Sequence, residues 1–454
     1  MRSGTEAAES NGRKSNFLTI AAGRRFMARR LQPPVRFCFI FSFNIPCMAS
    51  LISDLLTPPA TTTRKPALLK FAAYVWLALW PTVCLIMLSM ELRFGWTDGI
   101  GHPFGEDFIN FWSAAYLALH GHILTTYDFA AFHHFHTRLV GYEMNLYHYS
   151  YPPVMALVTL PFGLLPYLAA WLVWQVGGWL AFALCLRKVT PGNWLLLSLA
   201  WPALYVNTIS GQNGCWIAAI TGWGLLLLQS HRCFAAGLVF SLLMIKPQLA
   251  WLFPIALLSG REWKALIGMI VGAVCLFLAT LAAYGPTAWY AWHERVGILR
   301  RIILENGGGV MHRMMSVFVF VRHAGGSLTL AYAAQAIASL IAASLVVLIW
   351  RKTATTHYAF RWRAATLIFA MLAGSLYVTD YDCIILAMAC ALIWPVADLE
   401  GREALACAAI APILTSAIAK GTPVALGSFM LWPALFWIAR QCFMDRKHGL
   451  TSVV

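Results

Sequence analysis

Residues 151–186 read YPPVMALVTLPFGLLPYLAAWLVWQVGGWLAFALCL and contain no charged side chain. A transmembrane helix needs about 20 apolar residues, so this run is too long for one crossing. Pro161 and Pro166 interrupt it, because proline removes a helix hydrogen bond and clashes with the preceding turn. Arg187 and Lys188 follow, a pair typical of cytoplasmic loops. We expect a partly inserted segment and then one membrane-spanning helix that ends inside the cell.

The whole 454-residue chain has the same apolar character. Hydrophobic residues make up 60% of it and charged residues only 11%, against about a quarter in soluble domains. Mean hydropathy is +0.68. These values exclude a soluble globule, a disordered chain and a disulfide-rich secreted module. The sequence therefore predicts an all-α polytopic membrane protein.

Further apolar runs of suitable length give about twelve transmembrane helices in total. We expect the others at about 68–90, 193–209, 214–229, 234–245, 249–259, 265–285, 328–350, 364–378, 383–397, 403–419 and 424–440. With the N-terminus inside, the basic clusters between the runs all fall in the cytoplasm, which explains most of the net charge of +15. Nucleic-acid binding is therefore not expected.

The two ends of the chain differ from the membrane domain predicted at 67–441. Residues 1–66 are basic and weakly patterned, and no cleaved signal peptide is expected there. Met48 begins a short segment that resembles a normal cytoplasmic N-terminus before a first crossing. It is therefore a candidate alternative start of translation. Residues 442–454 are expected to form a cytoplasmic tail.

The first external loop is expected at 91–150. Two stretches in it, FINFWSAAYLAL (108–119) and TTYDFAAFHHFHTRLV (125–140), carry apolar residues at helical spacing. Such stretches favour helices that lie in the membrane interface. Counting the predicted crossings from a cytoplasmic N-terminus places this loop outside. The same count places three other polar groups outside or near the outer face: GQN (211–213), KPQ (246–248) and TDYD (379–382).

Asp107 stands immediately before the first amphipathic stretch, with Glu106 beside it. The free N–H groups of a first helical turn stabilise a carboxylate at that position. One interpretation is a helix cap and nothing more; the other is a catalytic acid at the membrane surface.

Lys246 lies inside the apolar region, where an ammonium group costs several kcal/mol unless it faces water or an anion. Its flanking apolar runs are short, so we expect Lys246 and Gln248 at a helix break lining an outward-facing cavity. The partner of Lys246 is either a phosphate or a salt bridge to Asp380 or Asp382.

The predicted outer loop 286–327 is basic, although external loops are normally depleted in positive charge. An external anion such as a lipid phosphate would explain this, and simple solvation is the alternative. The candidate anion-binding residues are Arg300, Arg301, His312 and Arg313.

No metal or tightly bound cofactor is expected. The 11 cysteines include no CxxC pair. The histidines of the first external loop, including His133 and His136, lack an acidic or cysteine ligand at metal-binding spacing, so interfacial histidines are the favoured interpretation.

Five strings, in order, resemble glycosyltransferase family 87, a family of integral membrane enzymes of the GT-C superfamily. They are EDFINFWSAAYLALHGHILTTYD, YPPVMALVTLPFGLLPYLAAWLVW, GQNGCW, AAGLVFSLLMIKPQLAWLFPIALL and YVTDYDCIILAMA. The resemblance covers about residues 70–395. It implies a GT-C-like helix bundle and places the family's catalytic acid at Asp107, its Lys-Pro element at Lys246 and its Tyr-Asp element at Tyr381 and Asp382.

The resemblance also implies a reaction. A hexosyl group, mannosyl in related enzymes, would pass from a polyprenyl-phosphate-linked donor to a lipid or glycan acceptor at the periplasmic face of the inner membrane. One carboxylate can act as general base for an inverting displacement, and cationic side chains can stabilise the departing phosphate. Gln212 and Asn213 are further cavity candidates.

Two other functions fit a polytopic chain with cavity-lining charges. A transporter or flippase would place its charges near the midplane and often has two similar halves, but no internal repeat is visible. A surface-polysaccharide ligase or polymerase would also use lipid-linked donors, with its large loop late in the chain rather than first.

Overall fold

The computed structural model describes residues 66–352 and 357–448, all within one unit of the chain, residues 45–454. Most of the predicted N-terminal segment and the proposed start at Met48 lie outside the described residues. The described part is helical, without strands; its only β-type pairings are two isolated bridges, Thr97 with Pro103 and Met314 with Thr379. The prediction of an all-α chain is confirmed for these residues.

The α-helices differ widely in length. They are α3 (Pro66–Glu91), α4 (Phe108–Leu119), α5 (Phe129–Val140), α6 (Pro153–Gly163), α7 (Tyr167–Val189), α8 (Trp194–Ala200), α9 (Pro202–Ile209), α10 (Gly214–Gln229), α11 (Cys233–Ser241), α12 (Pro247–Ala250), α13 (Leu252–Ser259), α14 (Trp263–Leu299), α15 (Val317–His323), α16 (Leu328–Lys352), α17 (His357–Ala373), α18 (Leu386–Ile393), α19 (Leu399–Gly421), α20 (Gly427–Met430) and α21 (Trp432–His448). Shorter helical turns are η1 (Ile123–Tyr127), η2 (Leu242–Ile245), η3 (Arg300–Glu305), η4 (Met311–Arg313), η5 (Asp380–Ile385) and η6 (Trp394–Val396).

Five helical stretches of the described chain are long and apolar enough to cross a membrane. They are Tyr74–Glu91, Tyr167–Val189, Trp263–Glu305, Leu328–Arg351 and Leu399–Gly421. Several other predicted crossings consist of two short helices, such as α8 with α9 and α12 with α13. The opening run is divided into the short α6 and the longer α7, with Pro166 at the N-cap of α7 as predicted. The prediction that Pro161 also interrupts the run is wrong, because Pro161 lies inside α6.

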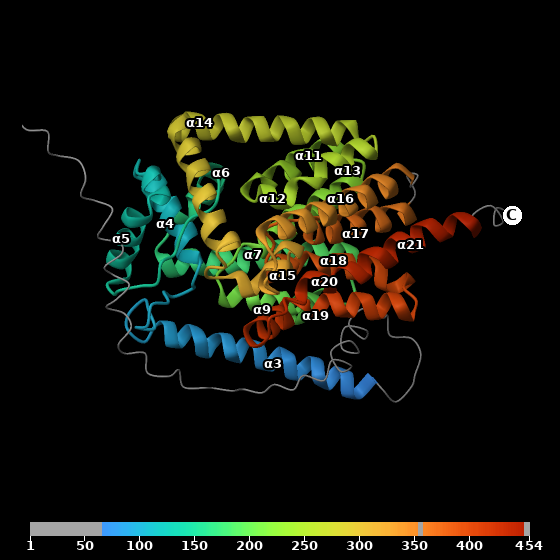
Figure 1. Ribbon diagram of the computed structural model, residues 1–454, viewed down its shortest axis with the longest axis horizontal. Helices are drawn as coiled ribbons and strands as arrows, with labels where there is room; N and C mark the ends of the chain where they lie inside the picture. The colour runs from blue at the N-terminus through green and yellow to red at the C-terminus, as the bar shows by residue number, and fades with distance from the viewer. Residues whose placement is uncertain (1–65, 353–356, 449–454) are drawn as a thin grey trace, which may run out of the picture. The chain divides into compact units, whose positions relative to one another are not determined.

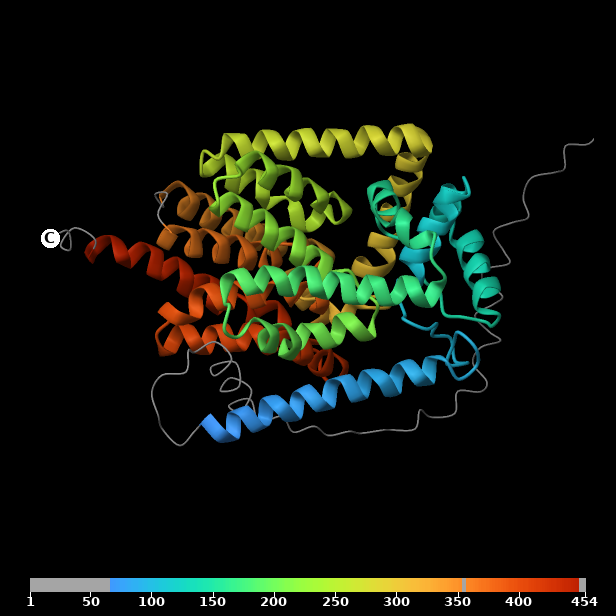
Figure 2. The ribbon, with the colours of Figure 1, turned by 180° about the vertical axis from the view of Figure 1, so that it is seen from behind.

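The structure corrects the prediction that 286–327 is a loop. α14 continues past residue 285 and η3 extends it to Glu305. The helix kinks at Gly285, whose φ of 72° and ψ of 172° are not helical, and Pro286 then starts the second part. In both ribbon views the second part turns away from the first (Figures 1 and 2). α14 packs against α6 and η1.

The centre of the unit lies at α17, η5 and α18. Every residue of α18 is buried, and so are residues 378–385 just before it. The Asp-Tyr-Asp sequence at 380–382 is therefore buried inside the fold. At the other end of the chain α21 runs to His448, so the tail predicted from residue 442 begins as helix.

α5 contains an uncharged buried histidine. Asp128 caps its start by accepting a hydrogen bond from the Ala131 N–H at 2.8 Å. His136 is fully buried against the Phe132 ring, at 4.1 Å between centroids. Neither ring nitrogen has a hydrogen-bond partner among the described residues. Burial lowers the pKa of His136 to about 3, with His133 contributing in the same direction.

We expect the folded state to lose stability below about pH 6.5 on account of His136. A histidine whose pKa is lowered on folding stabilises the native state above its unfolded pKa, and unfolding takes up a proton below it. At pH 5.5 the loss is on the order of 1 kcal/mol. Thermal unfolding in detergent at pH 7.5 and 5.5 measures it: His136→Leu should reduce the difference, whereas the exposed His134→Leu should not. An unchanged difference in His136→Leu would contradict the assignment.

Candidate active site

One cavity of about 400 Å³ brings together polar groups from distant parts of the chain. Asp107 comes from the start of α4, Gln212 from the turn before α10, and Lys246 from the break between η2 and α12. Arg313 and Tyr381 come from η4 and η5. Its other lining residues include Asn110, Phe111, His148, Tyr151, Gln248, Trp292, Val296, Leu299, Arg300, Ile303, Leu304, Leu376, Tyr377 and Thr379.

The Asp107 carboxylate is held by two side-chain amides. Gln212 Nε2 donates to Oδ2 at 2.5 Å, and Asn110 Nδ2 donates to Oδ1 at 3.3 Å. The side chain accepts no hydrogen bond from the first-turn N–H groups of α4. The prediction that those groups hold the carboxylate is therefore wrong, because Asp107 has helical backbone angles and its side chain points to the 212 turn instead.

Two glycines let the 212 turn fit between the other segments of the site. Gly211 has a φ of +59°, and a Cβ there would meet the carbonyl oxygen of Gly105. A Cβ on Gly214 would meet the carbonyl oxygen of Tyr381. Only a residue without a side chain fits at these close approaches. The turn therefore contacts the segments of Asp107 and Tyr381 at the same time.

The electrostatics of the cavity favour a carboxyl group that can take up a proton. Burial raises the pKa of Asp107, and the charges of Arg313 and His148, the Gln212 hydrogen bond and Lys246 oppose that rise. A carboxylate with a raised pKa is a stronger base than a free one.

Glu106 does not line the cavity. It accepts a hydrogen bond from the Tyr147 hydroxyl, and its φ of 48° is unusual for a residue with a side chain. Burial raises its pKa, which the Tyr147 hydrogen bond opposes. Glu106 thus faces a different environment from Asp107 despite being next to it in the chain.

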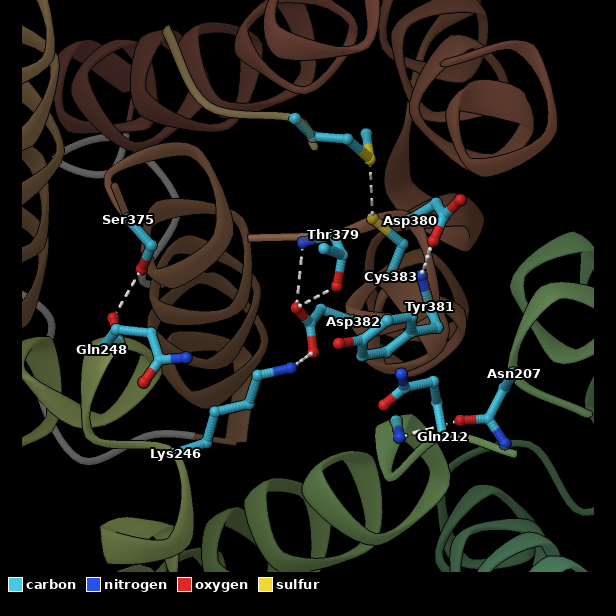
Figure 3. Close-up of polar contacts among 12 residues, drawn as sticks. Asn207, Gln212, Lys246, Gln248, Ser375, Thr379, Asp380, Tyr381, Asp382 and Cys383 are labelled. Carbon is cyan, nitrogen blue, oxygen red and sulfur yellow. Dashed lines mark hydrogen bonds and ion pairs between the residues drawn. The ribbon is translucent and has the colours of Figure 1, made fainter. Parts of the chain in front are cut away.

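Lys246 forms a salt bridge inside the fold. Its Nζ lies 2.5 Å from Asp382 Oδ1, and both side chains are almost fully buried. Asp382 Oδ2 accepts two further hydrogen bonds, from the Thr379 N–H and hydroxyl, each at 3.0 Å (Figure 3). Of the two acids the sequence allowed as salt-bridge partners, the structure selects Asp382. Lys246 also lines the cavity, so it has both a partner and access to the cavity.

Arg313 forms a salt bridge with the other acid of this sequence, Asp380. Its Nε and Nη2 donate to the two carboxylate oxygens of Asp380 at 3.1 and 3.0 Å. Both cations contact the Tyr381 ring, whose centroid lies 4.5 Å from Lys246 Nζ and 5.6 Å from the Arg313 guanidinium carbon. The Asp-Tyr-Asp sequence thus holds both cations at the cavity.

The remaining predicted residues divide into two groups. Gln248 lines the cavity, and its backbone carbonyl accepts a hydrogen bond from the Ser375 hydroxyl (Figure 3). Arg300 also lines it and pairs with Glu305 at 3.2 Å. Arg301, His312 and Asn213 are not among the lining residues. The described residues hold no group of three or more His, Cys, Asp or Glu that could hold a metal ion.

Asn110 and His148 are among the polar lining residues that sequence reasoning missed. Asn110 follows Asp107 by three positions, a spacing that places both on one face of a helix and could have identified it. His148 is one of the histidines of the predicted external loop 91–150, and no local sequence pattern distinguishes it from the others.

Comparison with known proteins gives one match. The family model for glycosyltransferase family 87 matches residues 149–375, which is half of the chain. No curated protein and no solved structure matches the chain. The matched range includes Gln212, Lys246 and Arg313, and the cavity adds Asp107 and Tyr381 from outside it. Together with its apolar membrane-span candidates, this match shows that the chain belongs to glycosyltransferase family 87.

Proposed function

We propose that the protein transfers a hexosyl group, mannosyl in keeping with the family resemblance, from a polyprenyl-phosphate-linked donor to a hydroxyl of a lipid or glycan acceptor. One observation carries the proposal: a carboxylate, Asp107, and two cations, Lys246 and Arg313, line the same cavity. A base, a place for the reacting centre and a positive site for the leaving phosphate are what this reaction needs.

In the proposed reaction Asp107 accepts the proton of the acceptor hydroxyl as its oxygen attacks the anomeric carbon. The bond from that carbon to the phosphate oxygen breaks in the same step, so the configuration inverts. The phosphate leaves as a weak base and needs no general acid. No metal or tightly bound cofactor takes part in this step.

The two cations are suited to a phosphate even though each has an acid partner. An ammonium group has three N–H donors and a guanidinium five. Asp382 takes one from Lys246, and Asp380 takes two from Arg313. The remaining donors, which bond no acceptor among the described residues, can contact a leaving phosphate as its charge develops. The acids hold the cations in place before the substrate arrives.

The apolar part of the cavity suits the lipid part of the donor. Trp292, Val296, Leu299 and Ile303, on the second part of α14 and on η3, line the same cavity as Asp107. Such a lining favours hydrocarbon over water. A donor with a sugar phosphate at one end and a polyprenyl chain at the other therefore matches both parts of the cavity.

We further propose a GT-C-like bundle of about twelve crossings in the inner membrane, with the cavity open to the periplasm and with interfacial helices in the first external loop. The alternation of basic clusters supports this topology, and so does the helical structure of residues 108–119 and 129–140, which form α4 and α5.

An incubation assay tests the proposed function. Purified protein in detergent is incubated with radiolabelled polyprenyl-phosphate hexoses and a lipid extract. We expect label in a new acceptor product, and the anomeric configuration of that product should be inverted. A transporter would give no product, because protein in detergent solution does not separate two compartments between which a substrate could move. Unchanged donor with every hexose tested would contradict the proposal.

A further inference from the structure

The only hydrogen bond shorter than 3 Å that the structure gives the Asp107 carboxylate comes from Gln212, which lies 105 positions further along the chain. An ionised carboxylate only accepts hydrogen bonds, so the NH₂ group of the amide must face it. The Gln212 side chain is buried, at 5% exposure. Its orientation is therefore fixed by the partner and by the surrounding packing.

The backbone of Gln212 is held on both sides. Its N–H donates to the Asn207 carbonyl at 3.0 Å, and its carbonyl accepts from the Trp174 indole at 3.2 Å. The Asn207 side chain supports the same turn, because its Oδ1 accepts from the Gly214 N–H at 2.8 Å (Figure 3). Gln175 in turn accepts from Asn207 Nδ2 at 3.3 Å. A chain of amide groups thus positions the Gln212 side chain from α7 and α9.

We propose that Gln212 is the positioning residue of the general base: its amide fixes Oδ2 of Asp107 and leaves Oδ1 to take the proton from the acceptor hydroxyl. Among the residues that the structure describes, Oδ1 has only the longer contact to Asn110, at 3.3 Å, and so remains the more available oxygen. This inference rests on the proposed function, since it assigns the two oxygens roles in that reaction.

Removing the amide should alter the ionisation of Asp107 and not only its position. A hydrogen bond to the charged form of a group lowers a carboxyl pKa, and one such bond corresponds to about one pKa unit. The charged groups facing Asp107 are Glu106 beside it, Arg313 and Lys246 in the cavity and the titratable His148. All of these groups stay in place in a Gln212 variant. A change in the pKa of Asp107 in that variant therefore reports the loss of the Gln212 N–H.

The first test is the pH dependence of kcat. In Gln212→Met we expect the acidic limb to move up by about one pH unit and kcat at neutral pH to fall about tenfold, with the donor KM nearly unchanged. In Gln212→Glu the limb should move further, because two neighbouring carboxyl groups cannot both ionise easily.

Gln335→Met is the matched control. Gln335 is an equally buried glutamine of α16 that accepts a hydrogen bond from the Phe318 N–H and donates one to the Gly374 carbonyl, and it does not line the cavity. Gln335→Met should lower thermal stability and leave the acidic limb of kcat where it is. An unmoved limb in Gln212→Met, or an equal shift in Gln335→Met, would show that the effect of Gln212 comes from the stability of the fold alone and would overturn the proposal.

A second measurement does not depend on activity. Infrared titration of protein with isotope-labelled aspartate follows the protonated carbonyl band, and Asp107→Asn identifies the band that belongs to Asp107. We expect this band to titrate at higher pH in Gln212→Met than in the wild type. If the wild type transfers no sugar but the shift is found, the proposed function fails and the Gln212 contact to an ionised Asp107 stands. Equal titration in both proteins overturns the inference whatever the activity.

Discussion

Asp107→Asn is expected to lower sugar transfer by ~10³-fold, within the range lost when a general base is removed. Asparagine has nearly the same shape and can still accept the hydrogen bond from Gln212 with its side-chain oxygen, so the fold should be preserved. The variant cannot accept a proton at neutral pH. The measurement is kcat with a radiolabelled donor, together with thermal unfolding and donor binding, both of which should stay close to wild type.

Asp128→Asn is the matched control for this variant. Asp128 lies in the same predicted external loop and caps α5, but it does not line the cavity around Asp107. It should keep activity within a few-fold and lose about 1 kcal/mol of stability or less through the weakened cap. Wild-type turnover in Asp107→Asn would remove Asp107 as the base.

Lys246→Met should have a large effect on both stability and donor binding. It leaves Asp382 buried without its cation, and breaking a buried pair in this way costs about 3–5 kcal/mol. It also removes one of the positive charges that line the cavity, so we expect the affinity for labelled polyprenyl phosphate to fall at least about tenfold. Thermal unfolding and equilibrium binding measure the two effects separately.

The double variant Lys246→Met/Asp382→Asn separates the structural role of Lys246 from its binding role. With both charges removed, most of the lost stability should return, whereas donor affinity should stay low. Arg440→Met removes the cation of an exposed pair with Glu400 and should change neither quantity by much. Full donor affinity in the double variant would mean that Lys246 is only a structural partner of Asp382.

The helix breaks near the site could be predicted from sequence because they depend on local features. Lys246 interrupts an apolar run and Pro247 follows it, and the structure has η2 end and α12 begin there. The same reasoning failed at Gly285 and Pro286. The predicted crossing ends at residue 285 and a loop was expected from 286, but proline also suits the first turn of a new helix, and the helix resumes.

The pairing of charged groups could not be predicted, because it depends on contacts between distant segments. Sequence allowed Lys246 to pair with Asp380 or Asp382, which differ by two positions. Thr379 and Asp382 bond each other at the start of η5, and this orients Asp382 toward Lys246. Asp380 is left for Arg313, which enters from a different part of the chain. The roles of these residues in sugar transfer stay predictions.

The bend in α14 makes the dimensions of the cavity depend on a residue outside it. Gly285 does not line the cavity, yet its torsion angles direct the following helix, which supplies Trp292, Val296 and Leu299 to the wall. The volume that this wall encloses therefore depends on the backbone angles of Gly285 as well as on the side chains that line the cavity.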